Sequence, residues 1–195
     1  MLDKIIYLLF VYPVYKIRLG AIGSRSKLMK TFITGHKRIF IGQKVFVRSH
    51  TWLAADPLTG DNNCTLKIGD GTYVGRFCHI YASSLIEIGK KVLIADKVYL
   101  SDNVHDYKNI HLPVIEQPVL QKSPVVIGDG AWLGENVCVI GAKVGRNCVI
   151  GANAVVTKDI PDYSVAIGSP AYIIRRYNET SKQWEETDKN GNFIK

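Results

Sequence analysis

The chain has 195 residues, a length that suits a single domain. Its net charge of +8 is concentrated at one end. Residues 1–50 contain ten lysines and arginines and one acid, a net of +9, whereas the remainder has fifteen against sixteen, a net of −1. No known nucleic-acid-binding motif accompanies the basic segment, so we expect no nucleic-acid partner.

The first predicted element is an aromatic-rich helix over residues 1–20. Its uncharged run, Ile5 to Tyr15, is eleven residues, which is too short to span a bilayer, and no small-residue cleavage site follows it. We therefore expect a cytoplasmic protein. Two roles for the helix stay open: it lies on an anionic membrane surface at the inner face of the membrane, or it caps the open end of the repeat that follows or packs on a neighbouring subunit. Residues 21–38 are predicted to be an irregular basic connection, so the N-terminal unit is residues 1–38.

From residue 39 the chain carries an aliphatic residue every six positions, often followed by a small one. A helix face repeats every 3.6 residues and a strand face every 2, so this period fits neither alone. It is typical of the hexapeptide form of the parallel β-helix, in which three hexads make one coil. The pattern predicts about five coils over residues 39–170. The clearest examples are Ile68-Gly69, Val74-Gly75, Ile127-Gly128, Leu133-Gly134 and Ile150-Gly151.

Two segments interrupt the repeat. Residues 54–66 form a polar excursion between coils, and residues 102–124 form a longer loop that contains three prolines. Long loops in compact domains are usually functional, so the second is a candidate site. Residues 171–177 predict a C-terminal helix, and the polar tail after it is expected to be partly disordered, so the last unit is residues 171–195.

The cysteines and histidines do not predict a metal site. The four cysteines, Cys64, Cys78, Cys138 and Cys148, have no CxxC spacing and are expected to be small buried thiols in a reducing compartment. His105 and His111 supply at most two ligands, and zinc needs three or four.

His105 is the leading candidate for chemistry, because it directly follows the last regular hexad before the loop. An imidazole has an unperturbed pKa near neutrality, which suits a general base. The neighbouring Asp102 and Asp106 are placed to orient its ring. An exposed loop histidine without function is the alternative from spacing alone.

Three stretches in this order resemble the hexapeptide-repeat acyltransferases, which have a left-handed parallel β-helix. The resemblance is strongest to the O-acetyltransferases of lipopolysaccharide, capsule and exopolysaccharide sugars, near the maltose and galactoside acetyltransferase branch. The stretches are Ile94 to Tyr107, Ile127 to Gly134, and Ile150 to Pro161 with Gly168-Ser169-Pro170-Ala171.

The resemblance implies acetyl-CoA as donor, a sugar hydroxyl as acceptor and His105 as general base. A backbone N–H near Trp132 to Gly134 is expected to stabilise the oxyanion. Relatives have arginine where this chain has Tyr172, so Arg176 is a candidate replacement. The residues assigned to the acceptor are His79, Asp102, Asn103 and Tyr107; those assigned to the cofactor are Trp132, Gly134, Glu135, Ala152, Thr157, Lys158, Pro170 and Arg175.

Family members form homotrimers with active sites between subunits, and the same is expected here. The favoured function is acetyl transfer to a hydroxyl of a bacterial surface-glycan precursor. Two alternatives stay open: N-acetylation of an amino sugar, and a non-catalytic β-helix scaffold.

Overall fold

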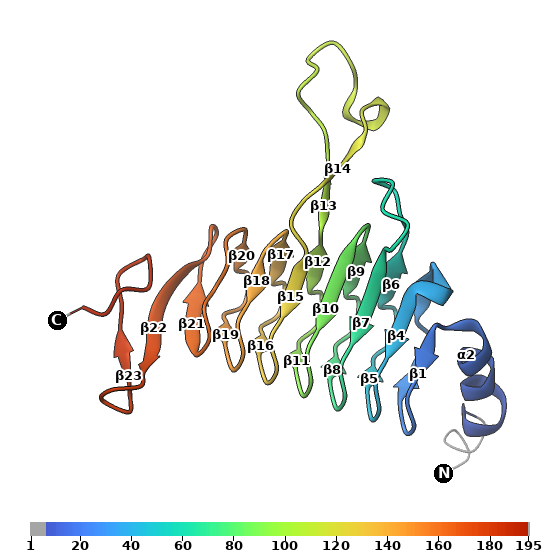
Figure 1. The fold of residues 1–195 in the computed structure, drawn as a ribbon, viewed down its shortest axis with the longest axis horizontal. Coiled ribbons are helices and arrows are strands. Elements are labelled where there is room, and N and C mark those ends of the chain that lie inside the picture. The colour runs from blue at the N-terminus through green and yellow to red at the C-terminus, as the bar shows by residue number, and fades with distance from the viewer. Residues whose placement is uncertain (1–6, 195) are drawn as a thin grey trace.

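The computed structural model describes residues 7–194, and in it the chain winds into a three-sided parallel β-helix (Figure 1). Each coil contributes one short strand to each of three flat sheets, named here A, B and C. Sheet A contains β1 (Ala21–Ile22), β4 (Ile39–Ile41), β7 (Thr65–Ile68), β10 (Leu85–Ile88), β15 (Val125–Ile127) and β18 (Lys143–Val144). Sheet B contains β2 (Lys27–Leu28), β5 (Phe46–Val47), β8 (Tyr73–Val74), β11 (Leu93–Ile94), β16 (Trp132–Leu133), β19 (Val149–Ile150) and β21 (Ser164–Ile167). Sheet C contains β3 (Phe32–Thr34), β6 (Trp52–Ala55), β9 (His79–Ala82), β12 (Tyr99–Ser101), β17 (Cys138–Ile140) and β20 (Val155–Val156).

The core consists of three columns of aliphatic side chains, one behind each sheet. Parallel pairing places each inward residue directly on its counterpart in the next coil, so the six-residue period of the sequence becomes a vertical stack. The column of sheet A is Ile22, Ile41, Ile68, Ile88, Ile127 and Val144; that of sheet B is Leu28, Val47, Val74, Ile94, Leu133 and Ile150. That of sheet C is Ile33, Leu53, Ile80, Leu100, Val139 and Val156. The predicted β-helix is confirmed, and left-handed winding stays a prediction from the resemblance.

Small residues stand at the corners because adjacent coils approach closely there. A Cβ built on Gly69 would lie 2.6 Å from the carbonyl carbon of Gly89 in the next coil. Such a contact is shorter than van der Waals distance, so a larger residue would force the coils apart.

The first coil lies earlier than the repeat predicts. Residues 21–34 contain β1, β2 and β3, which pair in parallel with β4, β5 and β6. The prediction of an irregular connection over residues 21–38 is therefore wrong, apart from the short 3₁₀ helix His36–Arg38. This coil is hard to detect because cations and polar residues interrupt its hexads.

A short helix covers the open end of this first coil. It comprises a π-helical turn, η1 (Tyr7–Val11), and α2 (Tyr12–Arg18), which agrees with the predicted helix over these residues; residues 1–6 lie outside the described chain. The Tyr7 hydroxyl accepts a hydrogen bond from Leu28 N at 2.9 Å, and the Tyr12 hydroxyl donates to Gly23 O at 3.3 Å. The helix therefore caps the solenoid. No helix among residues 7–194 is long and apolar enough to cross a membrane.

The C-terminal segment forms strands, so the predicted C-terminal helix is wrong. β22 (Tyr172–Asn178) pairs antiparallel with β21, and β23 (Gln183–Glu186) pairs antiparallel with β22. The open edge of sheet B offers unpaired backbone groups to an added strand, and the β-branched Ile173 and Ile174 suit a strand.

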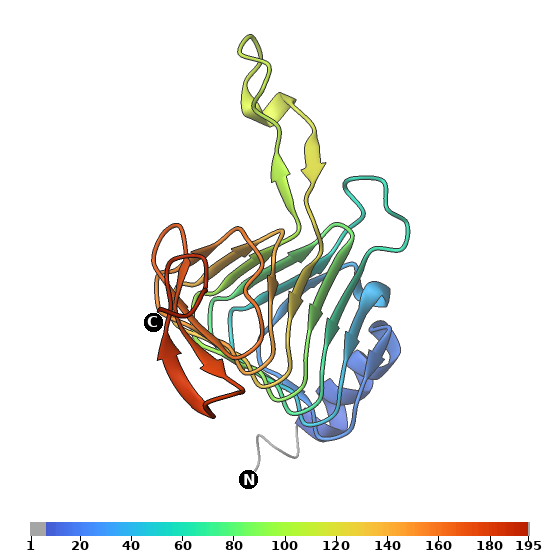
Figure 2. The same cartoon turned by 60° about the vertical axis from the view of Figure 1, so that its left-hand side comes forward.

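The loop at residues 102–124 stands out from the solenoid as an arm (Figures 1 and 2). Its base is a two-stranded antiparallel ribbon of β13 (Asn103–His105) and β14 (Val119–Gln121), and its outer part contains the 3₁₀ turn Val114–Glu116. The four cysteines are free thiols, three of them buried. Burial raises the pKa of the Cys64 thiol to about 12 and that of Cys78 to about 11, which makes both unreactive.

Candidate active site

His105 lies at the base of the arm, on the edge of a pocket of about 430 Å³. Sheet C forms the floor of this pocket and the arm forms its wall. The His105 ring is exposed, so it is accessible to a molecule in the pocket. The lining residues are Trp52, Leu58, His79, Tyr81, Tyr99, Asn103, Val104, His105, Val119 and Ile140. Of the four predicted acceptor residues, the structure brings His79 and Asn103 into this pocket.

The floor is a cluster of aromatic rings around His79. The imidazole stacks on the Trp52 indole with 4.6 Å between ring centroids and 11° between planes. Tyr81 and Tyr99 meet it edge-on at 5.8 Å and 5.3 Å. Trp52 is itself held by a hydrogen bond from its Nε1 to Thr34 Oγ1 at 3.1 Å. The result is a rigid aromatic surface next to an exposed imidazole.

The His79 Nε2 atom is buried and has no hydrogen-bond partner among the described residues. Burial also lowers the pKa of His79 from its ordinary value of 6.5, because the charged ring would lose its hydration. The His79 ring therefore lines the pocket as a neutral aromatic group, while its Nε2 atom is buried.

Sequence reasoning missed Trp52, Tyr81 and Tyr99. Trp52 and Tyr99 each directly precede an inward aliphatic of sheet C, as His79 does, and the register aligns all three on the outer face. Aligning the coils by their third hexad would have revealed the aromatic column.

Asp102 does not bind acceptor, contrary to the sequence prediction. Its side chain is fully buried, and its two carboxylate oxygens accept hydrogen bonds at 2.7 Å from the backbone N–H groups of Ser83, Ser84 and Leu85. Asp102 therefore holds the corner of the preceding coil against the root of the arm.

Asp106 and Tyr107, the two other loop residues with a predicted role, lie outside the pocket lining. The Asp106 carboxylate accepts hydrogen bonds from the backbone N–H groups of Tyr107 and Lys108 at 2.8 and 3.1 Å, which stabilises the local turn. Among the described residues, it makes no hydrogen bond to His105. Tyr107, predicted to bind acceptor, is 73% exposed and lies outside the pocket lining.

The two loops brace each other beside the pocket. Thr59, in the polar excursion, donates to Gln121 Oε1 at 2.6 Å, and Gln121 Nε2 donates to Asp102 O at 2.6 Å. The pocket wall is thus tied both to the solenoid and to the neighbouring excursion.

Three predicted cofactor residues, Gly134, Glu135 and Ala152, lie at the corners between sheets B and C, and a fourth, Trp132, lies in β16 of sheet B. Gly134 follows β16 and Ala152 follows β19, one coil apart, and a Cβ on Gly134 would lie 2.7 Å from Ala152 N. Glu135 pairs with Lys97 at 3.5 Å across exposed surface. Trp132 is about half exposed on sheet B. Of the backbone N–H groups near the predicted oxyanion site, those of Trp132 and Gly134 already donate to Cys148 O and Ile150 O at 2.8 Å.

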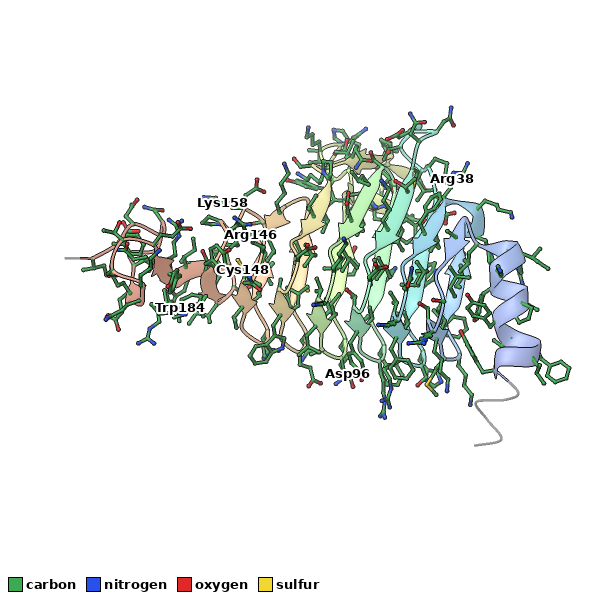
Figure 3. All side chains as sticks on the ribbon, turned by 60° about the horizontal axis from the view of Figure 1, so that its bottom comes forward. Arg38, Asp96, Arg146, Cys148, Lys158 and Trp184 are labelled. Carbon is green, nitrogen blue, oxygen red and sulfur yellow. The ribbon has the colours of Figure 1, made fainter. Side chains whose placement is uncertain are left out.

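Three others meet at a second pocket of about 490 Å³ near the C-terminal end of the solenoid: Thr157, Lys158 and Pro170. Figure 3 shows Lys158 on the side of the solenoid where the terminal hairpin begins. Arg175 does not join them; it pairs with Glu186 at 3.8 Å and lines a neighbouring hollow. Arg176 also lies outside the lining, so it does not replace the arginine expected at Tyr172.

Comparison with known proteins agrees with this architecture. The family model described as the hexapeptide repeat of succinyl-transferase matches residues 124–158. A probable acetyltransferase of Mycobacterium tuberculosis is 37% identical over 163 residues, which cover 77% of this chain and 54% of that protein. The putative lipopolysaccharide biosynthesis O-acetyl transferase WbbJ of Escherichia coli K12 is 40% identical over 126 residues, covering 60% of this chain and 63% of its own.

Among solved structures, the N-acyltransferase AntD of Bacillus cereus, in complex with dTDP and 3-hydroxybutyryl-CoA, superimposes with a TM-score of 0.72. The match covers 87% of this chain and 89% of that one at 17% identity, so it shows a common fold. The chain spans between about half and two thirds of the length of the two curated relatives above. It belongs to the hexapeptide-repeat acyltransferase family.

The shifted pKa of His79 gives a pH-dependence of stability. Because burial lowers the folded-state pKa below that of the unfolded chain, the unfolded chain binds more protons as the pH falls. We expect the free energy of unfolding of the wild type to fall between about pH 7.5 and 5.5 more steeply than that of His79→Phe, which keeps an aromatic ring but does not titrate. Urea unfolding at several pH values measures this.

The matched control for that comparison is His111→Phe, because His111 is exposed on the arm. This variant should follow the wild-type pH profile. Parallel profiles for wild type and His79→Phe would show that the buried imidazole does not contribute to the pH-dependence.

Proposed function

We propose that the protein transfers the acetyl group of acetyl-CoA to a hydroxyl of a sugar in a bacterial surface-glycan precursor. The observation that carries this proposal is the exposed imidazole of His105 beside a pocket with an aromatic floor. Aromatic rings pack well against the apolar faces of sugar rings, and Asn103 offers hydrogen bonds to hydroxyls. The 40% identity to a protein named as a lipopolysaccharide O-acetyl transferase supports the same acceptor class.

His105 acts as general base and then as general acid. Its ring nitrogen takes the proton of the acceptor hydroxyl as that oxygen attacks the thioester carbonyl carbon. The C–S bond then breaks, and the imidazolium returns the proton to the departing thiolate. The thioester is already activated, so the protein contributes mainly positioning and proton transfer.

Lys158 and its pocket are assigned to the donor. An ammonium group supplies countercharge to the phosphates of CoA, and Thr157 and Pro170 line the same hollow. In one chain the His105 pocket and the Lys158 pocket share no lining residue. In a homotrimer, the His105 pocket of one subunit would face the Lys158 pocket of the neighbouring subunit, so that the two pockets together form one active site.

Replacing His105 tests the mechanism. His105→Ala should lower kcat by about 10²–10⁴-fold, because it removes general-base catalysis while leaving the binding surfaces in place. The assay follows labelled acetyl transfer from acetyl-CoA to a panel of sugar nucleotides and glycosides by mass spectrometry. His111→Ala, on the same arm, is the control and should keep wild-type turnover.

The same assay separates the alternative acceptors. An O-acetyl ester is cleaved by mild base and an N-acetyl amide is not, so a base-stable product would indicate an amino-sugar acceptor. Undiminished turnover in His105→Ala would contradict the mechanism, and no transfer by wild type to any acceptor would favour a scaffold.

Mixing inactive subunits tests the shared site. If each site combines His105 of one subunit with Lys158 of the next, His105→Ala and Lys158→Ala chains refolded together should regain activity through interfaces that contain neither change. Each variant refolded alone should stay at its own low activity. Light scattering of the wild type should give three times the mass of one chain. A monomeric wild type would contradict the shared site. So would a mixture of the two variants that is no more active than either variant alone.

We also propose that the N-terminal helix binds an anionic lipid bilayer with the face it turns away from the solenoid. Leu9, Phe10, Val14 and Ile17 on this helix are exposed, with Phe10 at 70% and Ile17 at 73%. Cations flank them: Lys16 and Arg18 lie on the helix, and Lys37 Nζ donates to Ile17 O at 2.5 Å. An apolar strip with flanking cations matches the surface of an anionic membrane.

Vesicle sedimentation checks this contact. The wild type should sediment with vesicles of equal parts phosphatidylglycerol and phosphatidylcholine, and less with phosphatidylcholine alone. Phe10→Ser combined with Ile17→Ser should lose most of this binding, whereas Ile115→Ser, an 87% exposed residue on the arm, should not. Equal binding by all three proteins, or a change in subunit number for the double variant, would contradict membrane docking.

A further inference from the structure

The segment after β23 folds back over the terminal hairpin. Thr187 N donates to Ile174 O at 3.1 Å, and Thr187 also forms an antiparallel bridge with Phe193. Arg176 Nη1 donates to Gly191 O at 3.2 Å, and its guanidinium lies 5.8 Å from the centre of the Phe193 ring. The tail, predicted from sequence to be partly disordered, is therefore anchored on β22.

A tight turn at residues 188–192 shapes the end of this segment. The Asp188 carboxylate accepts hydrogen bonds from Asn190 N at 2.8 Å and from both nitrogens of Asn192 at 2.9 Å. These bonds, those from Asn192 foremost, lower the pKa of Asp188. Gly191 has a φ of +86°, and a Cβ there would lie 2.7 Å from Ile173 Cδ1, so the turn needs glycine to sit this close to β22.

The turn brings Lys189 to the pocket that contains Lys158. Lys189 Nζ lies 5.5 Å from the centre of the Tyr172 ring, and Lys189 and Asn190 line the pocket together with Thr157, Lys158, Ser169 and Pro170. Residues more than 30 positions apart in the sequence thus share one hollow. The sequence indicates only the Lys158 side of this hollow.

The two lysines form no ion pair among residues 7–194. Of the two acids next to them in sequence, Asp188 closes its own turn, and Asp159 lines the same pocket, where its Oδ1 accepts from Lys143 N at 2.8 Å. The pocket therefore carries two ammonium groups and one carboxylate, and this net positive charge favours an anionic ligand.

We propose that Lys189 is a second phosphate-binding residue of the donor site, supplied by the C-terminal tail. This inference rests on the proposed function, because the ligand it requires is CoA. CoA carries phosphate at two places, a pyrophosphate and a 3′-phosphate, and two separated ammonium groups match that distribution. The tail thus completes the nucleotide end of the donor site.

The test compares the affinities of CoA and dephospho-CoA, which lacks the 3′-phosphate, by isothermal titration calorimetry. Lys189→Gln should weaken CoA binding roughly tenfold, because one charge-assisted contact is lost. Loss with CoA alone assigns Lys189 to the 3′-phosphate, and equal loss with both ligands assigns it to the pyrophosphate. Both outcomes support the proposal.

Lys182→Gln is the matched control, because Lys182 is an exposed lysine in the turn between β22 and β23. It should bind CoA as the wild type does. A second variant, Gly191→Val, displaces the turn without changing charge and should weaken CoA binding as Lys189→Gln does. Thermal unfolding of each variant verifies that the solenoid remains folded.

The outcomes separate the two proposals. Wild-type affinity in Lys189→Gln, with CoA bound normally by the wild type, would overturn the role of Lys189 alone. Failure of the wild type to bind CoA would overturn the proposed function as well.

Discussion

The structure depends on the in-register stacking of aliphatic side chains along three columns. Each coil has too few residues to form a core of its own, and it buries its inward side chains mainly against the coils before and after it. Each fully buried aliphatic contributes about 1.5–3 kcal/mol, so the columns supply most of the driving force. The same stacking requires small corner residues, because Gly69 and Gly134 lie against the backbone of the next coil.

Stacking leaves both ends of the solenoid open, and the chain closes each end with a different element. At the N-terminal end, the tyrosines of the short helix satisfy backbone groups of the first coil through Tyr7 and Tyr12. At the other end, β22 and β23 extend sheet B with antiparallel pairing. Each cap also exposes groups that a solenoid coil does not have: an apolar strip with flanking cations at one end, and Lys189 at the other.

Regular coils make flat sides, so pockets form where the repeat is interrupted. The arm at residues 102–124 and the excursion near Thr59 rise from the same edge of the solenoid and enclose the space above sheet C. Asp102 makes this possible, because its buried carboxylate holds the corner from which the arm leaves. The rigid aromatic floor and the exposed His105 then face each other across one hollow.

The sequence by itself determined the β-helix and the break at residue 102, because a six-residue period fits no other common fold and its interruption is visible in composition. It also indicated His105 and Lys158, through position and resemblance. Only the tertiary structure showed that Asp102 is structural and that residues 21–34 form a coil. It alone replaced the terminal helix by a hairpin and brought Lys189 to Lys158. Those features depend on pairing between coils and on the open edge of sheet B, and contacts between distant segments leave no local periodicity in the chain.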